Sequence, residues 1–152
     1  MHQTIGERQT LQYNNVISTF FEVQPNQISQ TFESFLTTIF DAHYSANGPF
    51  FYCINSDVSG DGNILLQTFL PVKEDHINEL PSDYIYQTYF QVLNMVAVRA
   101  FGDSEVVISE SFQHLFHYIN KFQLKVRTPV FYLVTVDESD IYTDLLVGVG
   151  SD

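Results

Sequence analysis

The feature that most constrains the fold of this chain is a repeat of its own sequence at a spacing of 80 residues. Residues 16–60 align without a gap on residues 96–140, and 11 of the 45 aligned pairs are identical. The identical residues include Val16 and Val96, Phe21 and Phe101, Phe32 and Phe112, Pro49 and Pro129, and the dipeptide Phe51-Tyr52 with Phe131-Tyr132. Such self-similarity indicates that two copies of one structural unit follow each other along the chain.

Each copy carries one amphipathic helix with the same pattern. Apolar residues recur at offsets of 0, 4, 7, 8 and 11 residues, which places them along one stripe of a helix with 3.6 residues per turn. These residues are Ile28, Phe32, Phe35, Leu36 and Ile39 in the first copy and Ile108, Phe112, Leu115, Phe116 and Ile119 in the second. Pro25 suits the first turn of the first helix, and Asp103 or Ser104 suits the N-cap of the second.

A strand precedes each helix, and two strands joined by a turn follow it. β-branched and aromatic residues fill these segments, and Pro49 and Pro129 stop the helix before them. The expected strands cover residues 16–23, 50–55 and 64–70 in the first copy and 95–101, 130–136 and 142–149 in the second. We therefore predict an α+β fold of duplicated strand–helix–strand–strand (βαββ) units, with repeat 1 at about 16–72 and repeat 2 at about 95–149.

The segment between the repeats, residues 73–94, is expected to hold a polar connector (73–81) and an added edge strand (84–90). A single copy has only one helix to cover its strands, so two copies that share a sheet bury far more apolar surface than two separate ones. We therefore expect residues 1–152 to form one domain, and not two domains on a flexible linker.

The acidic composition of the chain argues against some classes of binding partner. The chain has 6 basic and 18 acidic residues and a formal net charge of −12, which repels nucleic-acid phosphates and anionic membranes. Its one cysteine, Cys53, excludes a disulfide framework within the chain. Because no apolar run reaches transmembrane length and the first residues lack the apolar stretch of a signal peptide, we expect a cytoplasmic protein that binds neither nucleic acid nor membrane.

Four short segments stand at marked places in this layout: Gly48-Pro49 before a strand, Pro71-Val72 at the end of a strand, Ala100-Phe101-Gly102-Asp103 before the second helix, and Thr143-Asp144-Leu145 in the last strand. With them, the duplicated layout resembles the GyrI-like domain, which also serves as the effector-binding half of MerR-type and AraC-type drug-sensing activators. Two positions depart from the family pattern: Asp144 stands where Glu is usual, and Gly148 stands where Pro is usual.

The resemblance implies an antiparallel sheet with two helices on one face, related by a pseudo-twofold axis, and a pocket between the two repeats. It also implies a lipophilic, often cationic, aromatic ligand, and an acidic residue at the position of Asp144 that faces this ligand. Some GyrI-like proteins hydrolyse strained small molecules, and some stand-alone ones act by binding a protein. With no DNA-binding helix-turn-helix in this chain, we expect a stand-alone GyrI-like domain.

Asp144 is the main candidate for a binding residue, because a carboxylate among aromatic rings attracts a cation. Strand alternation puts it on one face with Tyr142. The alternative is that Asp144 forms an ion pair with Arg99, in which case the pocket is already neutralised and should prefer neutral ligands. Tyr52 and Tyr132, paired by the repeat, and Tyr86 are further candidates for lining the pocket. Each buried hydroxyl would need a hydrogen-bond partner.

The other residues that suggest chemistry fit structural roles better, so we expect no metal and no cofactor. Residues 57–62 resemble the start of an EF-hand loop, but Thr68 occupies the position of the bidentate Glu. His114 and His117 have no further ligand in a zinc-binding pattern. Cys53 lies mid-strand without a visible base to activate it.

Three functions remain open from the sequence. The chain could bind a small hydrophobic or cationic ligand without catalysis, or it could be a protein-interaction domain that keeps the fold and lacks a pocket. The third and least favoured function is a hydrolase that uses Asp144 together with a tyrosine. Since an enzyme needs cooperating groups and only one carboxylate stands out, we expect a binding protein more than an enzyme.

Overall fold

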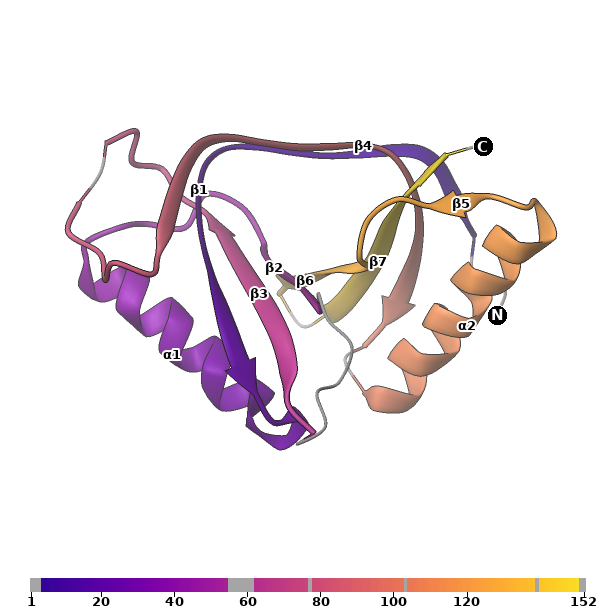
Figure 1. Cartoon of the computed structure of the whole chain (residues 1–152), viewed down its shortest axis with the longest axis horizontal. Coiled ribbons are helices and arrows are strands. Elements are labelled where there is room, and N and C mark those ends of the chain that lie inside the picture. The colour runs from indigo at the N-terminus through magenta and orange to yellow at the C-terminus, as the bar shows by residue number, and fades with distance from the viewer. Residues whose placement is uncertain (1–3, 55–61, 77, 103, 139, 151–152) are drawn as a thin grey trace. The chain divides into compact units, whose positions relative to one another are not determined.

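The computed structural model describes residues 4–54, 62–76, 78–102, 104–138 and 140–150 (Figure 1). The elements follow in the order β1 (Gly6–Val23), a 3-10 turn (Pro25–Gln27), α1 (Ile28–Asp41), β2 (Phe50–Ile54), β3 (Ile64–Pro71), β4 (Ile85–Phe101), α2 (Glu105–Lys121), β5 (Lys125–Val126), β6 (Phe131–Asp137) and β7 (Asp140–Gly150). They divide into two compact units. The first unit comprises residues 12–90, and the second comprises residues 1–11 together with 91–152.

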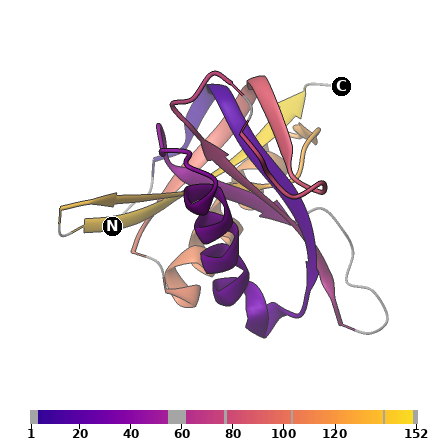
Figure 2. The same ribbon diagram turned by 90° about the vertical axis from the view of Figure 1, so that its left-hand side faces the viewer.

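In the first unit β3 lies between β1 and β2 and pairs antiparallel with both. Helix α1 covers one face of these strands, and Figure 2 shows it in front of them. The core between helix and strands follows the predicted stripe, since Phe35 and Ile39 of α1 are fully buried against Ile17 of β1 and Leu70 of β3. The regularly spaced apolar residues of the first helix therefore pack it against its strands.

In the second unit β7 pairs antiparallel with β4, β6 and the short β5. Leu115 and Ile119 of α2 are buried in a core with Val98 of β4 and Leu145 of β7. The side chain of Ser104 caps α2 by accepting a hydrogen bond from the Val107 amide, as predicted. The β5 strand was not predicted, because two residues are too few to produce a recognisable strand pattern.

The prediction of an α+β fold with antiparallel strands and two main helices is confirmed. Two strands are longer than expected. The first strand begins at Gly6 and not at residue 16, and the added strand at 84–90 is continuous with the predicted strand at 95–101, forming β4. No helix among the described residues is long and apolar enough to cross a membrane.

The structure corrects the gap-free alignment of the two copies in one place. Ile17 of β1 pairs with Leu70, two residues after the partner of Tyr52. The equivalent residue of β4 is Val96, which pairs with Val147, two residues after the partner of Tyr132. Val96 is 79 positions after Ile17, and both residues belong to the core under their helix. The helix residues Phe35 and Leu115 are 80 positions apart. The second copy therefore has one more residue between strand and helix, and the identical Val16 and Val96 belong to opposite strand faces.

Candidate functional site

Asp144 lies in the middle of β7, directly opposite Arg99 of β4. The two side chains form a bidentate ion pair, in which Arg99 Nε donates to Asp144 Oδ1 at 2.7 Å and Arg99 Nη2 donates to Oδ2 at 3.0 Å. Asp144 exposes 17% of its side chain and Arg99 exposes 47%. The hydrogen bonds that Arg99 donates to Asp144 raise the pKa of the Arg99 guanidinium above its ordinary value, so this cation stays charged at every physiological pH.

Tyr142 completes this group of side chains, which we call the ion-pair cluster (Arg99, Tyr142 and Asp144). The Arg99 guanidinium carbon lies 4.0 Å from the centre of the Tyr142 ring, a cation–π geometry. Leu145, the next residue along β7, belongs to the core under α2, so alternation directs Asp144 to the strand face away from that helix. The structure thus brings together three of the six predicted binding residues, but with the acid already neutralised.

Tyr132 lies on the other face of the same strands. It is opposite Leu145 in the β6–β7 ladder, and it packs against the core under α2. Burial raises the pKa of its hydroxyl. Because directly opposed residues share a face, Tyr132 and Asp144 point to opposite sides of the strands, and the structure does not bring them together.

The remaining two predicted tyrosines, Tyr52 and Tyr86, belong to the first unit. The Tyr52 ring packs on Phe32 of α1, with ring centres 4.6 Å apart, so it faces its helix as Tyr132 does. The Tyr86 hydroxyl donates to the carbonyl oxygen of Glu74 at 2.8 Å and lies 3.0 Å from Asn15 Oδ1. Tyr86 therefore fastens the connector between the repeats to the β1 strand, which is a structural role.

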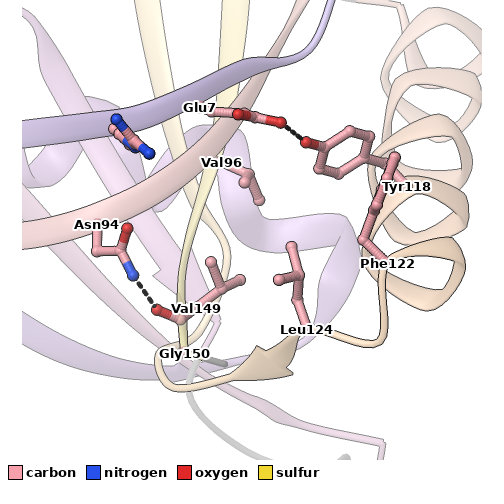
Figure 3. Close-up of a pocket in the computed structure, with 9 residues that line it drawn as sticks. Glu7, Asn94, Val96, Tyr118, Phe122, Leu124, Val149 and Gly150 are labelled. Atoms are coloured by element: carbon pink, nitrogen blue, oxygen red, sulfur yellow. Dashed lines mark hydrogen bonds between the residues drawn. The ribbon is translucent and has the colours of Figure 1, made fainter. Parts of the chain in front are cut away.

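The second unit contains a pocket that the sequence did not predict (Figure 3). Its volume is about 360 Å³, within the range of roughly 300–1,000 Å³ that is usual for small-molecule sites. Four segments that are distant in sequence line it: the start of β1, the bend of β4, the end of α2 with the following residues, and the end of β7. The lining residues are Glu7, Arg8, Asn94, Val96, Tyr118, Phe122, Leu124, Val149 and Gly150.

Apolar side chains dominate the middle of the pocket. Tyr118 of α2 and Phe122, the C-cap residue of this helix, are four residues apart and therefore lie on the same side of it, with ring centres 4.7 Å apart. Val96 and Val149 are buried, and Figure 3 shows Val96, Val149 and Leu124 extending into the space between the strands and the helix. This arrangement offers aromatic and aliphatic contacts to a small molecule.

Polar groups stand around this apolar centre. The Tyr118 hydroxyl donates to Glu7 Oε1, so the N-terminal end of β1 is attached to α2. Asn94 Nδ2 donates to the carbonyl oxygen of Val149 at 2.7 Å, and Asn94 has a left-handed φ of 56°, a conformation that asparagine adopts more readily than most residues. Since Glu7 and Arg8 both line the pocket, their formal charges cancel.

None of the pocket residues was in the set predicted from the sequence. The pattern that could have indicated them is the aromatic pair at positions i and i+4 near the end of α2, followed at once by Leu124. The predicted EF-like loop lies mostly outside the described residues. Among those that are described, no group of three or more His, Cys, Asp or Glu side chains is placed to hold a metal ion. Cys53 is buried in β2.

Residues 11–150 match the protein family described as "Domain of unknown function (DUF5085)". The match spans nearly the whole chain, and the chain belongs to this family. A search of curated protein sequences finds no match.

Solved structures show the likeness of fold. The crystal structure of the EcmrR C-terminal domain matches with a TM-score of 0.79 at 12% sequence identity, covering 100% of both chains. EcmrR in a cryo-EM complex with DNA matches with a TM-score of 0.71 at 12% identity, covering 99% of this chain and 58% of the other. An integron cassette protein of Vibrio cholerae matches with a TM-score of 0.53 at 13% identity, covering 97% and 95%. The resemblance to GyrI-like effector-binding domains that the sequence indicated is confirmed at the level of fold.

Proposed function

We propose that this member of the DUF5085 family is a small-molecule-binding domain that takes a lipophilic, aromatic ligand without transforming it. The observation that carries the proposal is the pocket of the second unit, whose centre is formed by aromatic and aliphatic side chains. The full-length likeness of fold to the EcmrR C-terminal domain supports it, because effector-binding domains of this fold bind small molecules.

The charges favour a neutral ligand over a cationic one. Asp144, the residue expected to attract a cation, already pairs with Arg99, and the pocket contains Arg8 as well as Glu7. An unshared carboxylate at either place would select for a cation, whereas a matched pair of charges gives no such preference. The same ion pair disfavours Asp144 as the carboxylate of a hydrolase, since both of its oxygens accept hydrogen bonds from Arg99.

A protein-interaction domain is the second candidate function. It is favoured by apolar side chains that remain exposed at the β6–β7 hairpin, where Val136 and Ile141 oppose each other and expose 69% and 40% of their surface. The neighbouring Phe101, at the end of β4, exposes 62%. If the chain is a protein-interaction domain without a functional pocket, aromatic compounds should leave its melting temperature unchanged.

The test is a thermal-shift screen of neutral and cationic aromatic compounds, followed by titration calorimetry. A ligand that binds only the folded protein raises its melting temperature. Phe122→Ala, in the pocket, should weaken binding about tenfold, roughly 1.4 kcal/mol. Phe40→Ala is the matched control, because Phe40 is also a half-exposed phenylalanine at the C-terminal end of a helix, at 47% against 54% for Phe122, and does not line the pocket. Equal effects of the two variants would contradict the proposed site.

A further inference from the structure

Glu7 and Asn94 present hydrogen-bond acceptors to a ligand in the pocket of the second unit, beside the N–H donors of Arg8. The Tyr118 hydroxyl has one proton, and it is donated to Glu7 Oε1. The carboxylate of Glu7 can only accept, and Figure 3 shows it beside the Tyr118 hydroxyl at the pocket. A ligand that meets Glu7 therefore has to supply the proton.

Asn94 is oriented in the same sense. Its Nδ2 donates to the carbonyl oxygen of Val149, and a carbonyl oxygen accepts only, so the amide cannot be turned the other way round. The amide oxygen of Asn94 consequently points away from Val149, as Figure 3 shows. The hydroxyl proton of Tyr118 and one amide proton of Asn94 are in use. Asn94 keeps its amide oxygen as an acceptor together with one N–H, whereas the Glu7 carboxylate offers acceptors alone.

The apolar centre of the pocket and the balance of its charges indicate the other two properties of the ligand, its aromatic character and its lack of net charge. Tyr118 and Phe122 offer aromatic surface, and Val96, Leu124 and Val149 offer aliphatic surface. Arg8 offsets the charge of Glu7, so no net charge in the lining requires a cation. A buried acceptor that a ligand covers without donating to it loses its hydrogen bond to water, at a cost in affinity.

We propose that this pocket selects neutral aromatic molecules that carry a hydroxyl or N–H donor, and that Glu7 and Asn94 receive that donor. The inference rests on the proposed function, because it names the ligand class of the same site. It also assigns Glu7 as a specificity-determining residue and gives no such role to Asp144.

The test compares pairs of compounds that differ only by a methyl group on the donor: naphthol with its methyl ether, and indole with N-methylindole. Titration calorimetry on the full chain should show that the donor member of each pair binds about tenfold or more tightly, the scale of a hydrogen bond to a charged group. Glu7→Ala should remove most of this preference. Tyr118→Phe should keep it, because the carboxylate then has both oxygens free.

Glu22→Ala is the matched control, since Glu22 is an exposed residue of the same β1 strand outside the pocket. It should leave the preference unchanged. Equal affinity for both members of each pair, or a preference that survives Glu7→Ala, would overturn the inference while the proposed function stands. If the wild-type protein binds none of the four compounds and none of the wider screen, the proposed function fails and the inference fails with it.

Discussion

Replacing Asp144 by asparagine separates the two roles that this residue could have. The variant keeps the size of the side chain and removes its charge. In the structure the carboxylate receives two hydrogen bonds from Arg99, at 2.7 and 3.0 Å, and Arg99 lies over the Tyr142 ring. An asparagine can keep at most one of these hydrogen bonds, because only its amide oxygen accepts.

The expected loss of stability follows from the exposure of the pair. Fully exposed ion pairs contribute about 0.2–1 kcal/mol, and breaking a buried pair costs about 3–5 kcal/mol. Asp144 is 17% exposed and Arg99 is 47% exposed, so the pair falls between these limits and nearer the first. We expect Asp144→Asn to lower the free energy of unfolding by about 1–2 kcal/mol, or the melting temperature by about 2–8 °C for a chain of this size.

Urea denaturation of a double-mutant cycle measures this quantity, with Arg99→Gln as the second substitution. Asp144→Asn should cost about 1–2 kcal/mol in the wild-type background and about 0.5 kcal/mol or less when Arg99 is already replaced. Equal losses in both backgrounds would refute the ion pair. If Asp144→Asn instead leaves stability unchanged and weakens the binding of an aromatic cation about tenfold or more, the original sequence-based prediction of a cation site is correct.

Three further outcomes follow from local geometry. A Cβ added at Gly148 would lie 2.8 Å from Thr128 Cγ2, so Gly148→Ala should cost about 1–3 kcal/mol in a urea denaturation experiment. Ser104→Ala removes the N-cap of α2 and should cost about 1 kcal/mol, visible as a lower melting temperature. Glu74 accepts a hydrogen bond from the Ser45 amide, which holds the pKa of its carboxyl below the ordinary value. That stabilisation is complete above the ordinary pKa and is lost as pH falls through the lowered one, so between about pH 5 and 3 Glu74→Gln should lose less stability than the wild type.

The helices could be predicted closely because each has a single buried stripe with a regular period. The first predicted stripe runs from Ile28 to Ile39, and α1 spans Ile28–Asp41. The alignment failed in the first strand for a related reason. Val16 and Val96 are both buried, so the same residue type suits either face, and residue identity alone does not reveal which face a strand position occupies.

The candidate site could be predicted only in part, because it depends on pairings between distant segments. Strand alternation correctly joins Tyr142 to the face of Asp144. Whether Arg99 meets Asp144 depends on the register between β4 and β7, two strands 45 residues apart at this point, and no local pattern encodes it. The pocket is harder still, because its lining runs from Glu7 to Gly150 and no short stretch of sequence contains more than two or three of its residues.

Gly148 connects the departure from the family pattern to this pocket. The usual proline has no N–H, but here the Gly148 amide donates to Thr128 Oγ1 at 2.8 Å, and the Gly148 carbonyl accepts from the Arg127 amide at 2.7 Å. These bonds bring the chain that follows α2 alongside the end of β7, where β5 pairs with Val149. A proline at Gly148 would lose the first bond and add bulk where even one extra carbon is too close to Thr128. The Val149 carbonyl oxygen in turn accepts a hydrogen bond from the Asn94 side chain. Gly148 therefore helps to position Val149 in the pocket lining and to orient the amide oxygen of Asn94.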